Sequence, residues 1–182
     1  GRESDYVELM ADEGAQYDEH IVIDLSELEP LVACPHSPDN IKKVSELSGL
    51  KVDQVLIGSC TNSSFTDLMN VAAILKGRKV HKDVSLGISF GSKQVLCMLG
   101  EYGAVAAFVE AGARILESTC GPCIGMGQSP KSDAVSLRTF NRNFYGRSGT
   151  MSAGVYLVSP ETAAISAVNG YVSSALDVEY VK

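Results

Sequence analysis

From about residue 52 onward the chain alternates short apolar runs with segments of helical periodicity, and this alternation constrains the fold more than any other feature. Val55-Leu56-Ile57 ends at Gly58, as a buried strand does, and the segment 64–75 follows with its apolar side chains on one helical face. Repeated strand–helix units predict a three-layer α/β/α domain with a largely parallel sheet. We expect further strands at 84–89, 114–116 and 155–158, and further helices after Gly91-Ser92, at 104–111 and at 160–169.

The first 50 residues differ from the rest, because they are acidic and contain few long apolar runs. Residues 21–25 are the stretch there that is typical of a strand, and three prolines then interrupt any regular element. We therefore expect residues 1–50 to form a leading arm that packs onto neighbouring structure, and residues 51–182 to form the α/β core.

The formal net charge of -7 argues against a nucleic-acid surface, because phosphate backbones need clustered lysines and arginines. The same charge repels small anions at long range, so an anion site must be built locally from a few arginines. No segment has the uncharged apolar run that a membrane span needs, and the polar N-terminus does not resemble a signal peptide. We therefore expect neither nucleic acid nor a membrane as a partner.

The chain has five cysteines: Cys34, Cys60, Cys97, Cys120 and Cys123. An odd number in a chain of this size does not suggest a disulfide scaffold, so a reducing, cytoplasmic compartment is expected. Clustered cysteines in such a compartment indicate metal or redox chemistry. We interpret Cys34 and Cys97 as structural residues.

Cys60 lies just past the first expected core strand and Cys120 just past the third, so two strand ends bring thiols to one sheet edge. The pair Cys120-x-x-Cys123 places two sulfurs close enough for one metal centre. Both segments are rich in Gly, Ser and Thr, which lets backbone N–H groups approach inorganic sulfide. Three thiolates leave one iron of a four-iron cluster open, and an open position marks a catalytic metal site.

Arg142 and Arg147 lie in a loop-like stretch that also contains Asn141. Arginine is the side chain suited to bidentate carboxylate binding. Two arginines beside an open iron describe a site for a di- or tricarboxylate, with the iron acting as a Lewis acid.

The segments 57–64, 120–127 and 141–147 together resemble the aconitase family, and the resemblance extends over essentially the whole chain. It implies a 4Fe-4S cluster and a partial carboxylate clamp. The implied residues are Cys60, Cys120 and Cys123 as cluster ligands, Asn141 in the cluster environment, and Arg142 and Arg147 as substrate-binding residues.

The reaction that this resemblance implies is isomerisation of citrate to isocitrate through cis-aconitate, by dehydration and rehydration. The pairs Gly121-Pro122 and Ser63-Ser64 look like the citrate branch. The alternative is a large-subunit fragment of isopropylmalate isomerase or homoaconitase.

The chain departs from the family in one large respect. In aconitases the Asp–His acid machinery lies in an earlier domain and the serine base in a later one, and His20, His36 and His81 do not match that machinery. The resemblance therefore implies a fragment of a larger multidomain enzyme, with no catalytic acid or base of its own and with the remaining domains as partners. We expect the fragment alone to be inactive, and its exposed cluster to be lost in air.

Other interpretations of the same residues remain open at this point. The three cysteines are unrelated core thiols in one reading, and in another they bind zinc, which needs a fourth ligand such as Cys97 or His81. The tetrapeptide 120–123 also matches a thioredoxin-like oxidoreductase, which requires a helix N-terminus, yet Gly125 and Gly127 follow directly. In the plainest reading the two arginines are surface charges. A binding or scaffold role without a cluster is a further class of function for the chain.

Overall fold

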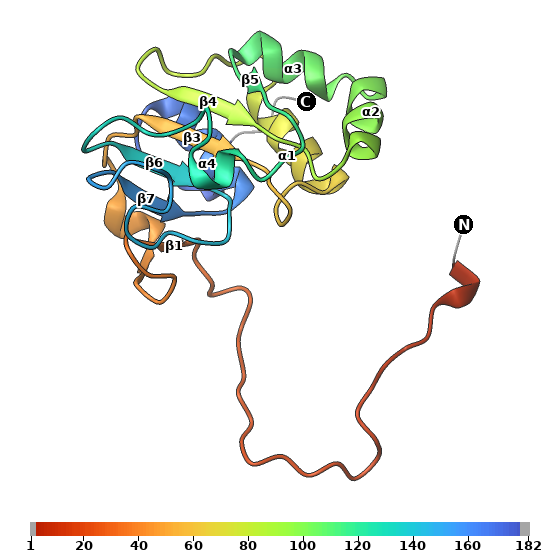
Figure 1. Ribbon diagram of the computed structural model, residues 1–182. Helices are drawn as coiled ribbons and strands as arrows, with labels where there is room; N and C mark the ends of the chain where they lie inside the picture. The colour runs from red at the N-terminus through yellow and green to blue at the C-terminus, as the bar shows by residue number, and fades with distance from the viewer. Residues whose placement is uncertain (1–2, 179–182) are drawn as a thin grey trace.

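The computed structural model describes residues 3–178, which fold around one seven-stranded sheet with the order β2-β1-β7-β6-β3-β4-β5 (Figure 1). The five strands from β7 to β5 are mutually parallel, whereas β1 runs antiparallel to both β7 and β2. This confirms the predicted α/β class and its largely parallel sheet. The strands are β1 (Leu31–Ala33), β2 (Ile41–Lys43), β3 (Gln54–Ile57), β4 (Ser85–Ile88), β5 (Arg114–Ile115), β6 (Val135–Arg138) and β7 (Gly154–Leu157).

β3 is the centre of the sheet, and all four of its residues are buried. It pairs with β4 from Gln54↔Ser85 to Ile57↔Ile88, and with β6 on its other edge. A strand that is covered on both faces is expected to be a continuous buried run, as this one is. The sequence analysis placed no strand at β6, although this strand borders β3 and ends directly before the predicted arginine loop.

The α-helices begin and end at residues whose chemistry favours helix termini. Ser64 caps α1, because its Oγ accepts a hydrogen bond from the N–H of Asp67 at 3.1 Å and its own N–H donates to Asp67 Oδ2 at 3.0 Å. Ser159 caps α4, which ends before Gly170. The helices are α1 (Phe65–Leu75), α2 (Lys93–Glu101), α3 (Ala104–Ala111) and α4 (Pro160–Asn169).

The two faces of the sheet are covered differently. Helix α1 contacts both α3 and α4, α4 also contacts β3, and Val55 and Ile57 join the hydrophobic core that includes these helices. Because side chains alternate along a strand, Gln54 points to the opposite face, where its Nε2 donates to the carbonyl oxygen of Gln128 at 3.2 Å. The layer on that face is a loop, Cys120–Gln128, which contains the short 3-10 helix η3 (Pro122–Ile124).

The leading arm is only partly built into the fold. Residues 3–28 are exposed and extend away from the body, apart from the 3-10 turn η1 (Glu3–Asp5) that they contain (Figure 1). The strand expected at 21–25 is wrong, because no strand of the described chain lies beside that segment to complete its hydrogen bonds. Further along, β1 and β2 form the antiparallel edge of the sheet, and the 3-10 helix η2 (Val44–Leu47) follows β2. A domain division at residue 50 stays a prediction.

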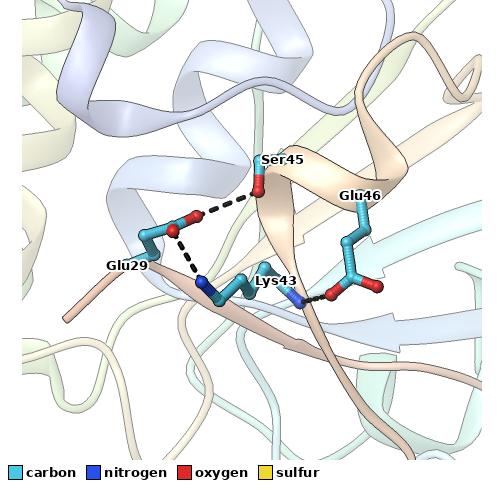
Figure 2. A network of polar contacts seen from close by, with 4 residues as sticks. All are labelled: Glu29, Lys43, Ser45 and Glu46. Carbon is cyan, nitrogen blue, oxygen red and sulfur yellow. Dashed lines mark hydrogen bonds and ion pairs between the residues drawn. The ribbon is translucent and has the colours of Figure 1, made fainter.

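A polar network lies where the arm enters the body (Figure 2). Glu29 accepts hydrogen bonds from Lys43 Nζ at 2.7 Å and from Ser45 Oγ at 2.9 Å, while the N–H of Lys43 donates to Glu46 at 2.8 Å. The bonds from Lys43 and Ser45 lower the pKa of Glu29. The network joins the end of the exposed arm to β2 and η2.

Within residues 3–178 no single helix has both the length and the apolar character of a membrane span; the pair α2 and α3, bent by 88°, meets those criteria only when taken together.

Candidate metal-cluster site

The structure brings the three predicted ligands, Cys60, Cys120 and Cys123, to the wall of one cavity of about 240 Å³. Cys60 follows β3 and the pair follows β5, so all three lie beyond the carboxyl ends of parallel strands. The same three cysteines also line an adjoining cavity of about 90 Å³. The rest of the larger cavity is lined by Phe140, Asn141, Arg142 and Arg147, all of which follow β6.

A sharp turn after β3 presents Cys60 to the cavity. Gly58 has a φ of 119°, and a Cβ on it would collide with the carbonyl oxygen of Ser89, so only glycine fits there. Ser59 follows with a φ of 70°, an uncommon conformation for a residue with a side chain. Hydrogen bonds hold the turn, from the N–H of Gly58 to Thr139 Oγ1 at 2.8 Å and from the N–H of Ser59 to Ser89 Oγ at 3.0 Å.

Asn141 orients the thiol of Cys60. Its Nδ2 donates to Cys60 Sγ at 3.5 Å, while Thr61 Oγ1 donates to its Oδ1 at 2.6 Å. Because Oδ1 is engaged by Thr61, the amide nitrogen is the end that faces the sulfur. This contact places Asn141 beside Cys60, one of the three predicted ligands.

The Cys120–Cys123 pair lies in a tight turn. The N–H of Cys123 donates to the carbonyl oxygen of Cys120 at 3.1 Å, and η3 ends at Gly125, whose φ is 86°. The 3-10 helix η3 begins between the two cysteines and contains Cys123, and the next described element is strand β6, not an α-helix. The thioredoxin-like reading therefore lacks the helix N-terminus that lowers the pKa of the attacking thiol.

The charges around the site act on one another. Burial raises the pKa of the Cys123 thiol, and negative charge on Cys120 and on Cys60 raises it further, while Arg147 and Arg138 lower it. Three thiols and two cations therefore share one electrostatic environment. An anionic cluster with its thiolates would meet positive charge here in spite of the net charge of -7.

The residues fit a polynuclear cluster better than a single ion. The described residues contain no group of three His, Cys, Asp or Glu side chains that converges on one metal ion, so the zinc reading lacks its geometry. In a four-iron cluster each thiolate binds a different iron, so the sulfurs surround a volume instead of meeting at a point. Ser59 Oγ is buried beside Cys60 and has no hydrogen-bond partner among the described residues, which leaves a donor for a sulfide or other acceptor in the cavity.

The arginine loop is anchored to the edge of the sheet. Arg142 is exposed, and Arg147 is half-buried with its guanidinium 5.5 Å from the ring centre of Phe144. Between them Asn143 is fully buried, and its Nδ2 donates to the carbonyl oxygen of Cys34 at 2.8 Å. Sequence reasoning assigned no role to Asn143, because its partners lie more than 100 residues away.

The two remaining cysteines have different environments. Cys34 is buried in the core, and burial raises the pKa of its thiol, as befits a structural residue. Cys97 is exposed on α2, so it is not part of the core, as its interpretation as a structural residue would suggest. Leu99 is the buried side chain of this helix.

A second missed residue is Arg138, the last residue of β6, which is 1% exposed. Its guanidinium contacts the Cys120–Gln128 loop from beneath, at the carbonyl oxygens of Pro122 and Gln128. The available signal was the alternation of Val135, Ser136 and Leu137 before it, which is typical of a strand.

Comparison with known proteins identifies this architecture. Residues 41–170 match the model of the aconitase family (aconitate hydratase). The chain is 46% identical to the 3-isopropylmalate dehydratase large subunit 2 of Archaeoglobus fulgidus over 174 residues, which are 95% of this chain and 42% of that protein. It is also 46% identical to the methanogen homoaconitase large subunit of Methanocaldococcus jannaschii over 164 residues, which are 90% of this chain and 39% of that protein.

A third relative is the 3-isopropylmalate dehydratase large subunit of Moorella thermoacetica, 45% identical over 176 residues, which are 96% of this chain and 42% of that protein. The chain thus spans about two fifths of the length of the curated relatives it matches. Their names favour the isopropylmalate and homoaconitase alternative over the expected citrate branch, so Gly121-Pro122 and Ser63-Ser64 do not decide between the branches. With its fold, three cysteines that line one cavity, and this match, the chain belongs to the aconitase family.

Proposed function

We propose that this chain holds the 4Fe-4S cluster and part of the carboxylate clamp of an aconitase-family hydro-lyase, of the kind that acts on isopropylmalate or on the homoaconitase substrates. The observation that carries the proposal is the single cavity shared by Cys60, Cys120 and Cys123 with Arg142 and Arg147. Thiolates and guanidinium groups on one wall suit a metal cluster and an anionic substrate together.

The proposed ligands are Cys60, Cys120 and Cys123, and a cluster bound there supplies an open iron that acts as a Lewis acid. The chain's own residues orient a ligand sulfur and bind the substrate. Asn141 fixes the position of the Cys60 sulfur through its hydrogen bond, and Arg147 and Arg142 bind substrate carboxylates at the mouth of the cavity. The acid and the base that move protons are proposed to lie on other parts of a longer enzyme.

The exposed arm fits this picture of a part that completes a larger assembly. Residues 3–28 expose many large apolar side chains, including Leu9, Met10, Val22 and Leu25. The relatives are called large subunits and are more than twice as long as this chain. We propose that the arm packs against the remainder of the same large subunit, in a cytoplasmic enzyme.

The test uses the longer parent enzyme, reconstituted anaerobically with iron and sulfide. We expect turnover of 3-isopropylmalate or of a homoaconitase substrate to exceed that of citrate, and Arg142→Lys to weaken substrate binding while the cluster spectrum persists. A parent enzyme that prefers citrate would return the assignment to the citrate branch. Normal kinetics in Arg142→Lys would remove this residue from the clamp.

The 182-residue chain alone is a second arm of the same experiment. It is expected to form the cluster without measurable hydratase activity. Robust turnover would show that no further acid or base is needed. Reduction of insulin disulfides by the chain would instead support the oxidoreductase alternative.

A further inference from the structure

Arg138 is a buried cation directly beneath the proposed cluster loop. Its side chain lies between β6 and that loop, and its guanidinium carbon is 5.6 Å from the ring centre of Phe140. A fully buried charge carries a large desolvation cost unless hydrogen bonds and an opposite charge compensate it. The hydrogen bonds and charges around Arg138 therefore indicate what it does.

The guanidinium joins both ends of the loop to the sheet. Its Nη1 donates to the carbonyl oxygen of Pro122, between the two cysteines, at 2.7 Å, and its Nη2 donates to that of Gln128 at 3.0 Å. On the sheet side, Nη2 donates to Gln54 Oε1 at 3.0 Å and Nε donates to Ser136 Oγ at 3.1 Å. One planar group thus fixes the turn that carries two of the three thiols to β3 and β6.

A buried arginine is usually paired with a carboxylate that supplies the opposite charge. Within residues 3–178 no Asp or Glu forms an ion pair with Arg138. Burial lowers its pKa to about 10, and the nearby Cys123 raises it. Arg138 is therefore charged at neutral pH, and Cys123, which would be an anionic thiolate as a cluster ligand, is the acidic group that acts on it.

We propose that Arg138 is a positioning residue for the cluster, which holds the Cys120–Gln128 loop in its ligating shape and stabilises the anionic site with a buried positive charge. The proposal rests on the proposed function. It requires both the fork of the guanidinium and its charge. Lysine retains the charge but, as a single ammonium group, cannot reach Pro122, Gln128, Gln54 and Ser136 together.

The first test measures cluster retention in the reconstituted 182-residue chain. Arg138→Met keeps an unbranched apolar stem and removes both the fork and the charge, and Arg114→Met is the matched control at an exposed site on β5. We expect iron release to a chelator, measured anaerobically, to be about 10–100-fold faster in Arg138→Met, as for other residues that support metal ligands. The reduction potential of the cluster should become more negative, because a cation that favours the added electron is gone. Arg114→Met should leave both unchanged.

A second readout does not depend on a loaded cluster. In the iron-free chain, amide hydrogen exchange across residues 120–128 should be faster in Arg138→Met than in wild type, and unchanged in Arg114→Met. Arg138→Lys separates the two roles. It should keep the potential near that of wild type while loop exchange and iron release accelerate, and it decides the question if the methionine variant does not fold.

The outcomes distinguish the two proposals. If the wild-type chain takes up no cluster, the proposed function fails and this inference fails with it. If wild type binds the cluster but the folded Arg138 variants match it in iron release, potential and loop exchange, the inference alone is overturned.

Discussion

Replacing Asn143 with alanine tests how the arginine loop is held to the sheet. The side chain is fully buried, and its two Nδ2 hydrogens are shared among the carbonyl oxygens of Ala33, Cys34 and Ser37. Losing two hydrogen bonds at about 1 kcal/mol each, and leaving buried carbonyls short of a donor, costs about 2–4 kcal/mol. Asn143 Oδ1 has no partner among the described residues, and its removal recovers part of this cost. We therefore expect a loss of about 2–3 kcal/mol in the free energy of unfolding.

Urea denaturation followed by circular dichroism measures this loss, and the melting temperature should fall by about 4–12 °C. Asn70→Ala is the matched control, because Asn70 is exposed on α1 and its change should stay within about 0.5 kcal/mol. A change below about 0.5 kcal/mol in Asn143→Ala would refute the anchoring role and, with it, the reason given for the position of Arg142 and Arg147.

Three further predictions follow from single contacts. Gly125→Ala should destabilise the chain by more than about 1 kcal/mol in urea denaturation. The φ of Gly125 is 86°, and the added Cβ would collide with the carbonyl oxygen of Ser148. An unchanged denaturation midpoint would show that the turn relaxes freely. Burial alone would raise the pKa of Asp53, but its bonds to Lys131 and to a backbone N–H outweigh burial and lower it. That contribution is fully present above the ordinary Asp pKa of about 3.9 and is lost as the pH falls from there through the lowered pKa of the folded state. Asp53→Asn should therefore cost about 1 kcal/mol at pH 7 and less at pH 3, and an equal difference at both pH values would contradict the assignment. Cys97→Ser should leave cluster formation unchanged in the visible spectrum, since Cys97 is exposed on α2 and lines neither cavity of the cluster site; loss of the chromophore would make it a ligand.

Local chemistry made much of the fold predictable. The Ser64–Asp67 capping box placed the start of α1, and the Ser159-Pro160 pair placed the start of α4, because these signals act within one turn of helix. The three cysteines could be assigned to one sheet edge because parallel strands end on the same side. Such inferences need only the order of elements along the chain.

The residues that were missed depend on contacts across the chain. Arg138 is explained by Pro122 and Gln128, which lie on another loop, and Asn143 by Cys34, which follows strand β1. No local pattern specifies a partner that distant. The reverse error occurred at residues 21–25, where a suitable local pattern has no neighbouring strand in the described chain to complete it.

The most direct test of the account is the iron content and visible spectrum of the 182-residue chain after anaerobic reconstitution, compared between wild type and Cys60→Ser. Wild type should bind about four irons with a charge-transfer chromophore. Cys60→Ser should lose that chromophore while its fold persists, because its thiol is one of the three that line the cavity in the described part of the chain. An unchanged cluster in Cys60→Ser, or a folded wild-type chain that binds no iron, would contradict the assignment of these three cysteines as ligands.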